Sequence, residues 1–167
     1  MDDLERRVDE LSRRVQVLED ELAIHRQIVR YGLAVDAGDA DAAAALFTED
    51  TVYDVDGPLR MEGREGVRAM VRGPRHQAMV GHCAHQIGPA VVEVAGDRAR
   101  AAGYSRVYVR REAGIEIYRV SLNRWELERR DGEWLVARRT TRLLGHEEAL
   151  TVFAGEPPTP GGRARPR

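Results

Sequence analysis

The sequence predicts an α+β domain in which helices come first and an antiparallel sheet follows. Two observations lead to this class. Apolar residues recur with a helical period through the N-terminal part of the chain, whereas three long stretches after residue 90 have strand character and are separated by short turns. Helices that precede a run of strands are typical of α+β domains. The length of 167 residues fits one domain, and a hydrophobic share of 43% is enough for a core.

Residues 1–23 form the first predicted element, a helix with a heptad pattern. Its apolar residues alternate at intervals of four and three, which is typical of a coiled-coil seam. These residues are Leu4, Val8, Leu11, Val15, Leu18 and Leu22. We expect this helix to pair with other copies in a homodimer or homotrimer, or to pack across its own sheet. An arm that recruits a different partner is the alternative.

The helix continues into the main domain, residues 24–154, and is expected to end near Ala37-Gly38, because glycine suits a left-handed C-cap. Asp39 is the expected N-cap of a short second helix over Ala40–Phe47. A third short helix is predicted over Gly63–Val71. The tail at 155–167 is rich in Pro, Gly and Arg, and we expect it to be disordered.

The strands are predicted from runs of β-branched and aromatic residues between turn signals. Asp131-Gly132 is a strong signal for a two-residue hairpin, and Pro89, which has no N–H to donate, sets the expected start of the second strand at Ala90. The predicted strands are Thr51–Asp56, one from Ala90 to the Gly96-Asp97 turn, Ala99–Arg111, Ile115–Arg130 and Glu133–Leu144.

Composition excludes several classes of function. The net charge of −2 argues against a nucleic-acid partner. No apolar run approaches the length of a membrane span, and the charged N-terminus does not resemble a signal peptide, so we expect a cytoplasmic protein. Cys83 is the only cysteine, which rules out an internal disulfide. His82 and His85 flank it, but no further ligands with metal-binding spacing follow, so no metal site is expected.

The stretch from Tyr31 to Asp56 carries three polar groups that stability alone does not require, namely Tyr31, Asp36 and Asp54. Its spacing, RY-x3-V-D-A-G-D-x-D-x4-LF-x2-D-x3-D, resembles the SnoaL-like branch of the nuclear transport factor 2-like (NTF2-like) superfamily. The resemblance extends from Ile24 to Leu144. It implies a cone-shaped barrel, in which a curved antiparallel sheet and three helices enclose one apolar pocket.

The same resemblance implies a catalytic set. In SnoaL-like proteins an aspartate at the helix end orients a histidine on the strand after the long loop. Dehydrochlorinase and bile-acid dehydratase members are similar to this chain at Tyr31, Asp36 and the H-x2-H pair, which implies that Tyr31, Asp36 and His85 are catalytic. His82 competes with His85 for this place and is expected to line the pocket. The structural alternative for Asp36 is a carboxylate that ends the helix and caps the next segment.

The chemistry implied is general-base catalysis. An aspartate that accepts one imidazole N–H fixes the tautomer, so the other ring nitrogen can remove a proton from the substrate. The Tyr31 hydroxyl would donate to a substrate oxygen, unless the ring only anchors the core. Arg139 would bind an anion or polarise a leaving group if it faces the pocket. Strand alternation places Arg139 on one face and Arg138 and Arg142 on the other, and a solvated basic rim is the alternative.

A second interpretation uses the same scaffold. Tyr31, Asp54 and Asn123 match by position the tyrosine, the aspartate base and the second oxyanion-hole acid of ketosteroid isomerase-like members. Asn123 departs from the pattern, because an amide is a weaker donor than a protonated carboxyl group. Asp54 would then move a proton next to a carbonyl, or it is simply a strand-end carboxylate that faces solvent. Tyr53 joins the substrate-binding candidates beside it.

The sequence therefore predicts a cofactor-independent lyase of the dehydratase or eliminase type. Its expected substrate is a small, apolar, cyclic molecule such as a steroid, a polyketide or an aromatic compound. Three alternatives stay open. They are an isomerase or polyketide cyclase with Asp54 as the base, a ligand-binding module without turnover, and a subunit of a larger oxygenase, since a fold does not by itself fix a function.

Overall fold

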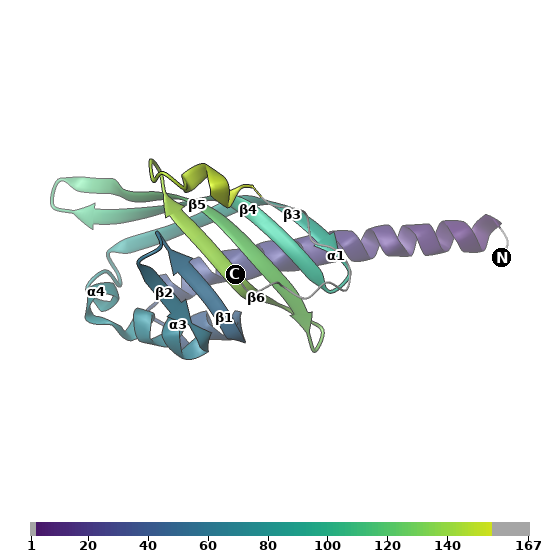
Figure 1. Ribbon diagram of the computed structural model, residues 1–167, viewed down its shortest axis with the longest axis horizontal. Helices are drawn as coiled ribbons and strands as arrows, with labels where there is room; N and C mark the ends of the chain where they lie inside the picture. The colour runs from purple at the N-terminus through teal and green to yellow at the C-terminus, as the bar shows by residue number, and fades with distance from the viewer. Residues whose placement is uncertain (1–2, 155–167) are drawn as a thin grey trace.

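The computed structural model describes residues 3–154 (Figure 1). Its helices are α1 (Asp3–Asp36), α2 (Ala40–Ala45), α3 (Gly63–Arg72), α4 (Pro74–Gln77) and a 3₁₀ helix, η1 (Ala149–Val152). Its strands are β1 (Phe47–Val55), β2 (Leu59–Glu62), β3 (Cys83–Ala95), β4 (Arg98–Arg111), β5 (Gly114–Arg130) and β6 (Glu133–Leu143). The predicted disordered tail lies outside the described residues.

The six strands form one curved sheet in the order β2-β1-β6-β5-β4-β3, and α1 runs along one face of it (Figure 1). The α+β class and the curved sheet are thus confirmed. The sheet is open, with β2 and β3 at its edges. Neighbouring strands are antiparallel except for β1 and β6, which pair in parallel although two helices and four strands lie between them in the chain.

The core lies between the inner face of α1 and the concave face of the sheet. Buried residues of α1 recur every three or four positions, which is one face of a helix. They are Ile24, Ile28, Tyr31 and Val35, and they belong to the same cluster as Ala99, Ala101, Trp125 and Leu127 of the sheet. Although α1 is 34 residues long, no helix within residues 3–154 is apolar enough over a sufficient length to cross a membrane.

Local signals account for most of the element boundaries. Asp39 caps α2 as predicted, because its Oδ1 accepts the N–H of Ala42 at 2.9 Å. The Asp131-Gly132 turn joins β5 to β6, and both residues have positive φ angles of 52° and 83°. This is the backbone that a tight hairpin of the predicted type requires.

Two boundaries differ from prediction. Strand β3 begins at Cys83 and not at Ala90, because the register between β3 and β4 shifts between Ile87 and Ala90 and the resulting bulge contains Pro89. A bulge is a position where proline interrupts a sheet without ending the strand. Strand β1 begins at Phe47, which the sequence placed at the end of the second helix. The short strand β2 was not predicted.

Candidate active site

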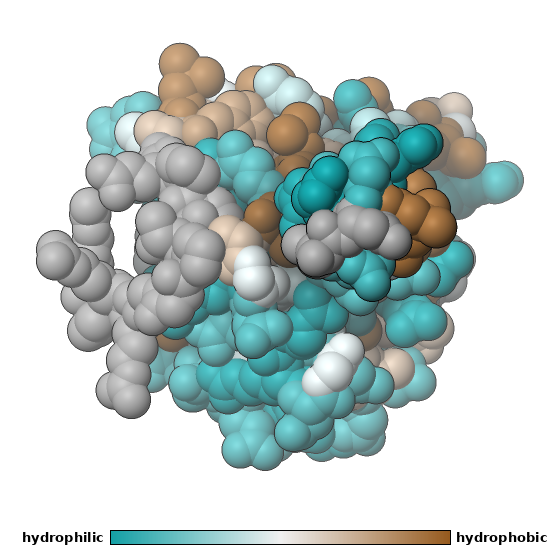
Figure 2. All heavy atoms as spheres, turned by 90° about the vertical axis from the view of Figure 1, so that its right-hand side faces the viewer, coloured by the Kyte–Doolittle hydropathy of each residue, from teal (hydrophilic) through white to brown (hydrophobic). Residues whose placement is uncertain are grey.

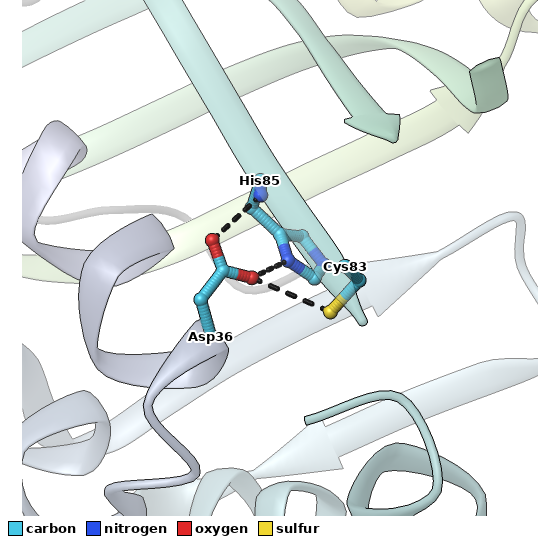
Figure 3. Close-up of side chains that lie close together, drawn as sticks. All are labelled: Asp36, Cys83 and His85. Atoms are coloured by element: carbon cyan, nitrogen blue, oxygen red, sulfur yellow. Dashed lines mark hydrogen bonds and ion pairs between the residues drawn. The ribbon is translucent and has the colours of Figure 1, made fainter. Parts of the chain in front are cut away.

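Asp36 and His85 form a close pair at the junction of α1 and β3 (Figure 3). The Oδ1 atom of Asp36 lies 2.5 Å from Nδ1 of His85, and Oδ2 accepts the backbone N–H of the same histidine at 2.7 Å. One carboxylate therefore holds both the ring and the backbone of His85. Because β3 is an edge strand, this N–H can point away from β4 and towards the helix end.

The same contacts set the charge of Asp36. Burial raises the pKa of this carboxyl group, but the hydrogen bonds from the His85 ring and backbone outweigh burial and lower it below its usual value. Asp36 is therefore ionised at neutral pH. An ionised partner at Nδ1 favours the tautomer that carries its proton there and leaves Nε2 as an acceptor. Within residues 3–154, Nε2 of His85 has no hydrogen-bond partner.

Cys83 is a third member of this cluster, although the sequence analysis considered it only as a disulfide or metal-ligand candidate. Its thiol donates to Oδ1 of Asp36 at 3.5 Å. The sequence did contain a signal for this contact. Cys83 lies two residues before His85, and residues two apart on a strand lie on the same face. Burial and the nearby Asp36 carboxylate raise the pKa of the thiol to about 11, so Cys83 is a neutral donor and not a nucleophile.

Asp36, Cys83 and His85 also offer three potential metal-ligand atoms within 4.8 Å of one another. Two features count against a zinc site at this place. Both oxygens of Asp36 already accept from His85, and a metal ion at Nδ1 would have to displace the contact of that nitrogen with Oδ1. The cluster fits a hydrogen-bonded aspartate–histidine pair better than a metal centre.

Helix α4 contributes His76, which sequence reasoning missed because the surrounding loop has no clear period. Its Nε2 lies 2.8 Å from the carbonyl oxygen of Val35, and its ring centroid is 6.2 Å from that of His85. His76 thus ties α4 to the last turn of α1, beside the pair.

Gly32 permits the close approach of α1 to β3. A Cβ atom at this position would lie 2.6 Å from the carbonyl oxygen of His85, and that oxygen is backbone and cannot rotate away. The glycine is one turn before Asp36, so the helix and the strand touch where the pair forms.

We expect Gly32→Ala to disturb the pair although alanine favours helices. Helix propensity would stabilise the variant by up to about 1 kcal/mol, but overpacking costs about 1–3 kcal/mol. The free energy of unfolding should therefore fall, and activity should fall with it. Leu33→Ala is the control, because Leu33 is 66% exposed on the same helix. A Gly32→Ala protein as stable and active as the wild type would contradict this account.

Three aromatic rings, those of Tyr31, Phe47 and Tyr53, pack together in the core. Tyr31 is only 7% exposed and packs edge-on against Phe47 and Tyr53, with ring centroids 5.6 and 6.1 Å away. Burial and the neighbouring Tyr53 raise the pKa of the Tyr31 hydroxyl well above its usual value. The Tyr31 hydroxyl is therefore neutral at neutral pH and can donate a hydrogen bond, and the ring also belongs to the core.

Arg139 lies among these rings, and it is the member of the Arg138, Arg139 and Arg142 group that faces α1. It is 3% exposed, and its guanidinium carbon lies 4.7 Å from the ring centroid of Tyr31 and 4.6 Å from that of Tyr53. Within residues 3–154, no carboxylate pairs with it, and its buried Nη1 has no hydrogen-bond partner. A buried cation without a counter-ion is costly.

Asn123 is the polar neighbour of Arg139. Its Oδ1 accepts from Nη2 and Nε of Arg139 at 2.8 and 3.2 Å, and its Nδ2 donates to Oγ of Ser105 at 2.9 Å. Both donors of Arg139 converge on one amide oxygen, so the amide is oriented by the arginine and Ser105 together. Asn123 is fully buried, and its donor side is already occupied.

Asp54 has a different environment. Its two oxygens accept from Arg142 at 2.8 and 3.0 Å, and Oδ1 also accepts the N–H of Gly57. Burial raises its pKa, but the hydrogen bonds from Arg142 and Gly57 lower it below the usual value. Tyr53 faces α1, so the adjacent Asp54 points to the opposite face of the sheet. The structure does not bring Asp54 together with Tyr31 and Asn123.

A hollow of about 400 Å³ lies between α4 and the β4–β5 hairpin. Its wall combines Met79, Val109 and Tyr118 with His82 and three arginines, Arg75, Arg110 and Arg111. Val109 pairs with Cys83, so the hollow is at the end of β3 that carries the aspartate–histidine pair. The wall is mixed in polarity, whereas the sequence predicted an apolar one.

The structure thus brings the sequence-predicted residues together in two groups. Asp36 and His85 form the first, with Cys83 and His76 added. The second contains Tyr31, Tyr53, Asn123 and Arg139. His82 lies apart on the wall of the hollow, and Asp54 on the other face of the sheet.

Comparison with known proteins agrees with this architecture. The profile of the SnoaL-like domain family matches residues 16–140. An NTF2-like protein with a cystatin-like fold from Novosphingobium aromaticivorans is 38% identical, with a TM-score of 0.84 over 93% of this chain and 99% of that one. The Mycobacterium tuberculosis protein Rv3472, of unknown function, is 30% identical over 81% of this chain and 75% of its own, with a TM-score of 0.70.

A hexachlorocyclohexane dehydrochlorinase, LinA-type3 from Novosphingobium barchaimii, shares the fold. It is 20% identical over 77% of this chain and 89% of its own, with a TM-score of 0.66. No functionally curated protein matches the chain in sequence.

Proposed function

This chain belongs to the SnoaL-like domain family, and from that premise we propose that it is a cofactor-independent lyase of the dehydratase or eliminase type. The observation that carries the proposal is the 2.5 Å contact between Oδ1 of Asp36 and Nδ1 of His85. The fold shared with a dehydrochlorinase is consistent with it. Small cyclic molecules that fit the cone are the proposed substrates.

The proposed reaction starts at Nε2 of His85. This nitrogen removes a proton from a substrate carbon, and the electron pair of the broken C–H bond forms a double bond to the neighbouring carbon. The leaving group, a hydroxyl or a halide, departs with the electrons of its own bond. Asp36 stabilises the imidazolium that forms, because its carboxylate is ionised and holds the ring.

Arg139 and Tyr31 are proposed to act at the leaving group. The unpartnered Nη1 of Arg139 is a buried donor with a permanent positive charge, which suits an oxygen or halide that becomes negative. Tyr31 adds a neutral hydroxyl, since its pKa is raised. His82 and Arg75 border the hollow through which a substrate would enter.

The second candidate, an isomerase or cyclase with Asp54 as the base, has less support. Asp54 accepts three hydrogen bonds, two of them from Arg142, and its lowered pKa makes it a weak base. The hydrogen-bond donor of Asn123 that would serve an oxyanion already binds Ser105.

The two candidates predict opposite rankings of variants. Asp36→Asn should lower kcat/KM by about 10²–10⁴-fold, since the amide neither fixes the tautomer nor stabilises the imidazolium. Asp54→Asn should leave the rate close to that of the wild type and lower stability. The assay is a panel of cyclic compounds with a hydroxyl or halide beside an acidic C–H, in which mass spectrometry detects loss of water or hydrogen halide.

The reverse ranking would replace the lyase by the isomerase or cyclase. A panel member that binds, as measured by calorimetry, but is never converted by the wild type would instead favour a ligand-binding module.

A further inference from the structure

The N-terminal part of α1, residues 3–22, is an arm with one apolar face that the domain does not cover. Figure 1 shows it projecting beyond the sheet, and Figure 2, which looks at it end-on, shows brown side chains gathered on one side of it. The side chains of the seam are 49–68% exposed, and they are Leu4, Val8, Leu11, Val15, Leu18 and Leu22. A free helix with this stripe is marginal in water unless it packs.

The opposite face of the arm is the one attached to the domain. In the heptad that places Leu18 at position d, Asp20 falls at position f, away from the seam. Asp20 is 5% exposed, and it accepts from Nη2 of Arg129 at 2.6 Å and from Nε1 of Trp134 at 3.1 Å. The domain therefore fixes the arm with its apolar seam facing outwards.

We propose that the seam binds the seam of a second copy of this chain in a parallel, in-register, two-stranded coiled coil. Position a holds Val8, Val15 and Leu22, of which the two valines are β-branched, and position d holds leucine at Leu4, Leu11 and Leu18. A β-branched residue at a with leucine at d favours two parallel strands over three or four.

The flanking charges select the parallel orientation. In the parallel pair, Arg14 at position g faces Glu19 of the second copy at position e, and Glu21 faces Arg26 in the same way. None of these four has an ion pair within residues 3–154. An antiparallel pair in which Leu4 lies opposite Leu22 would match Arg7 with Glu21, but it would oppose Arg14 to Arg14 and Glu5 to Glu19. Like charges therefore disfavour the alternative.

The oligomeric state tests the proposal first. The full chain should sediment as a dimer, with twice the mass of one copy. The double variant Leu11→Asp with Leu18→Asp should sediment as a monomer, because two carboxylates would replace two leucines in the core of the coiled coil. Arg13→Asp is the control, since it puts the same side chain at position f, outside the seam, where Arg13 forms an ion pair with Glu10 of its own helix. Circular dichroism of the strands checks that each variant is folded.

Crosslinking tests the orientation. With Cys83 replaced by alanine, Leu4→Cys should form an intersubunit disulfide in high yield, because equivalent d positions meet in a parallel pair. In an antiparallel pair Leu4 would lie opposite Leu22, roughly 27 Å from its equivalent, too far for a disulfide. A monomeric or trimeric wild type, a dimer that survives the double substitution, or a dimer without the crosslink would each overturn the proposal.

Discussion

His85→Ala should lower kcat/KM by about 10²–10⁴-fold on any substrate that the wild type converts, because it removes the general base. The loss should fall mainly on kcat, since alanine leaves the aromatic rings and Arg139 in place to bind the substrate. Steady-state kinetics at neutral pH would measure the change. A rate within threefold of the wild type would remove the aspartate–histidine pair from the mechanism.

A histidine outside the proposed site provides the control for the His85→Ala substitution. His25 lies on α1, on the side with Arg26, Val29 and Arg30, and the proposed chemistry does not use it. His25→Ala should keep both kcat and KM. Thermal unfolding of both variants would separate a loss of catalysis from a loss of fold.

Arg139→Met should abolish most activity and yet leave the protein at least as stable as the wild type. Removal of one donor at a developing negative charge costs about 10²–10³-fold in kcat. Replacement of a buried charge by an apolar side chain of similar volume is often neutral or stabilising by about 1–4 kcal/mol. This gain offsets the cost of about 1–3 kcal/mol for leaving the buried Oδ1 of Asn123 without its two donors. Arg139 has no carboxylate partner within residues 3–154, so its burial is poorly compensated. Urea unfolding would test the predicted stability, and the elimination assay would test the predicted loss of activity.

Arg142 offers the contrasting case on the same strand. It is also buried, at 7% exposed, but it pairs with Asp54 and Glu148. Arg142→Met should destabilise the protein by about 1–3 kcal/mol, less than the cost of breaking a fully buried pair, because a quarter of Asp54 is in contact with solvent. If Arg139→Met were the more destabilising of the two, Arg139 would be a structural residue.

The sequence was most informative where a local rule decides the structure. The N-cap at Asp39 and the hairpin at Asp131-Gly132 were confirmed because each depends on a few neighbouring residues. The start of β3 was wrong, since the rule that proline ends a strand ignores a bulge, and only the register with β4 reveals one. The parallel pairing of β1 with β6 was likewise beyond local patterns, because it joins distant segments.

The candidate site shows the same division. The pairing of Asp36 with His85 was predicted from a family resemblance, and the structure brings the two residues together. Gly32, His76 and Cys83 were missed as neighbours of the pair, because their contacts depend on how α1, α4 and β3 pack. Which of the three arginines of β6 points inwards also needed the structure.

The hollow beside α4 and the free end of the arm are at opposite ends of the molecule (Figure 1). Attachment through the arm, either to a second copy of the chain or to a sensor chip, therefore leaves the hollow facing bulk solvent. A ligand that binds at the hollow would reach it equally well in the dimer and on the chip. Titrations on immobilised protein should give the same dissociation constants as titrations in free solution.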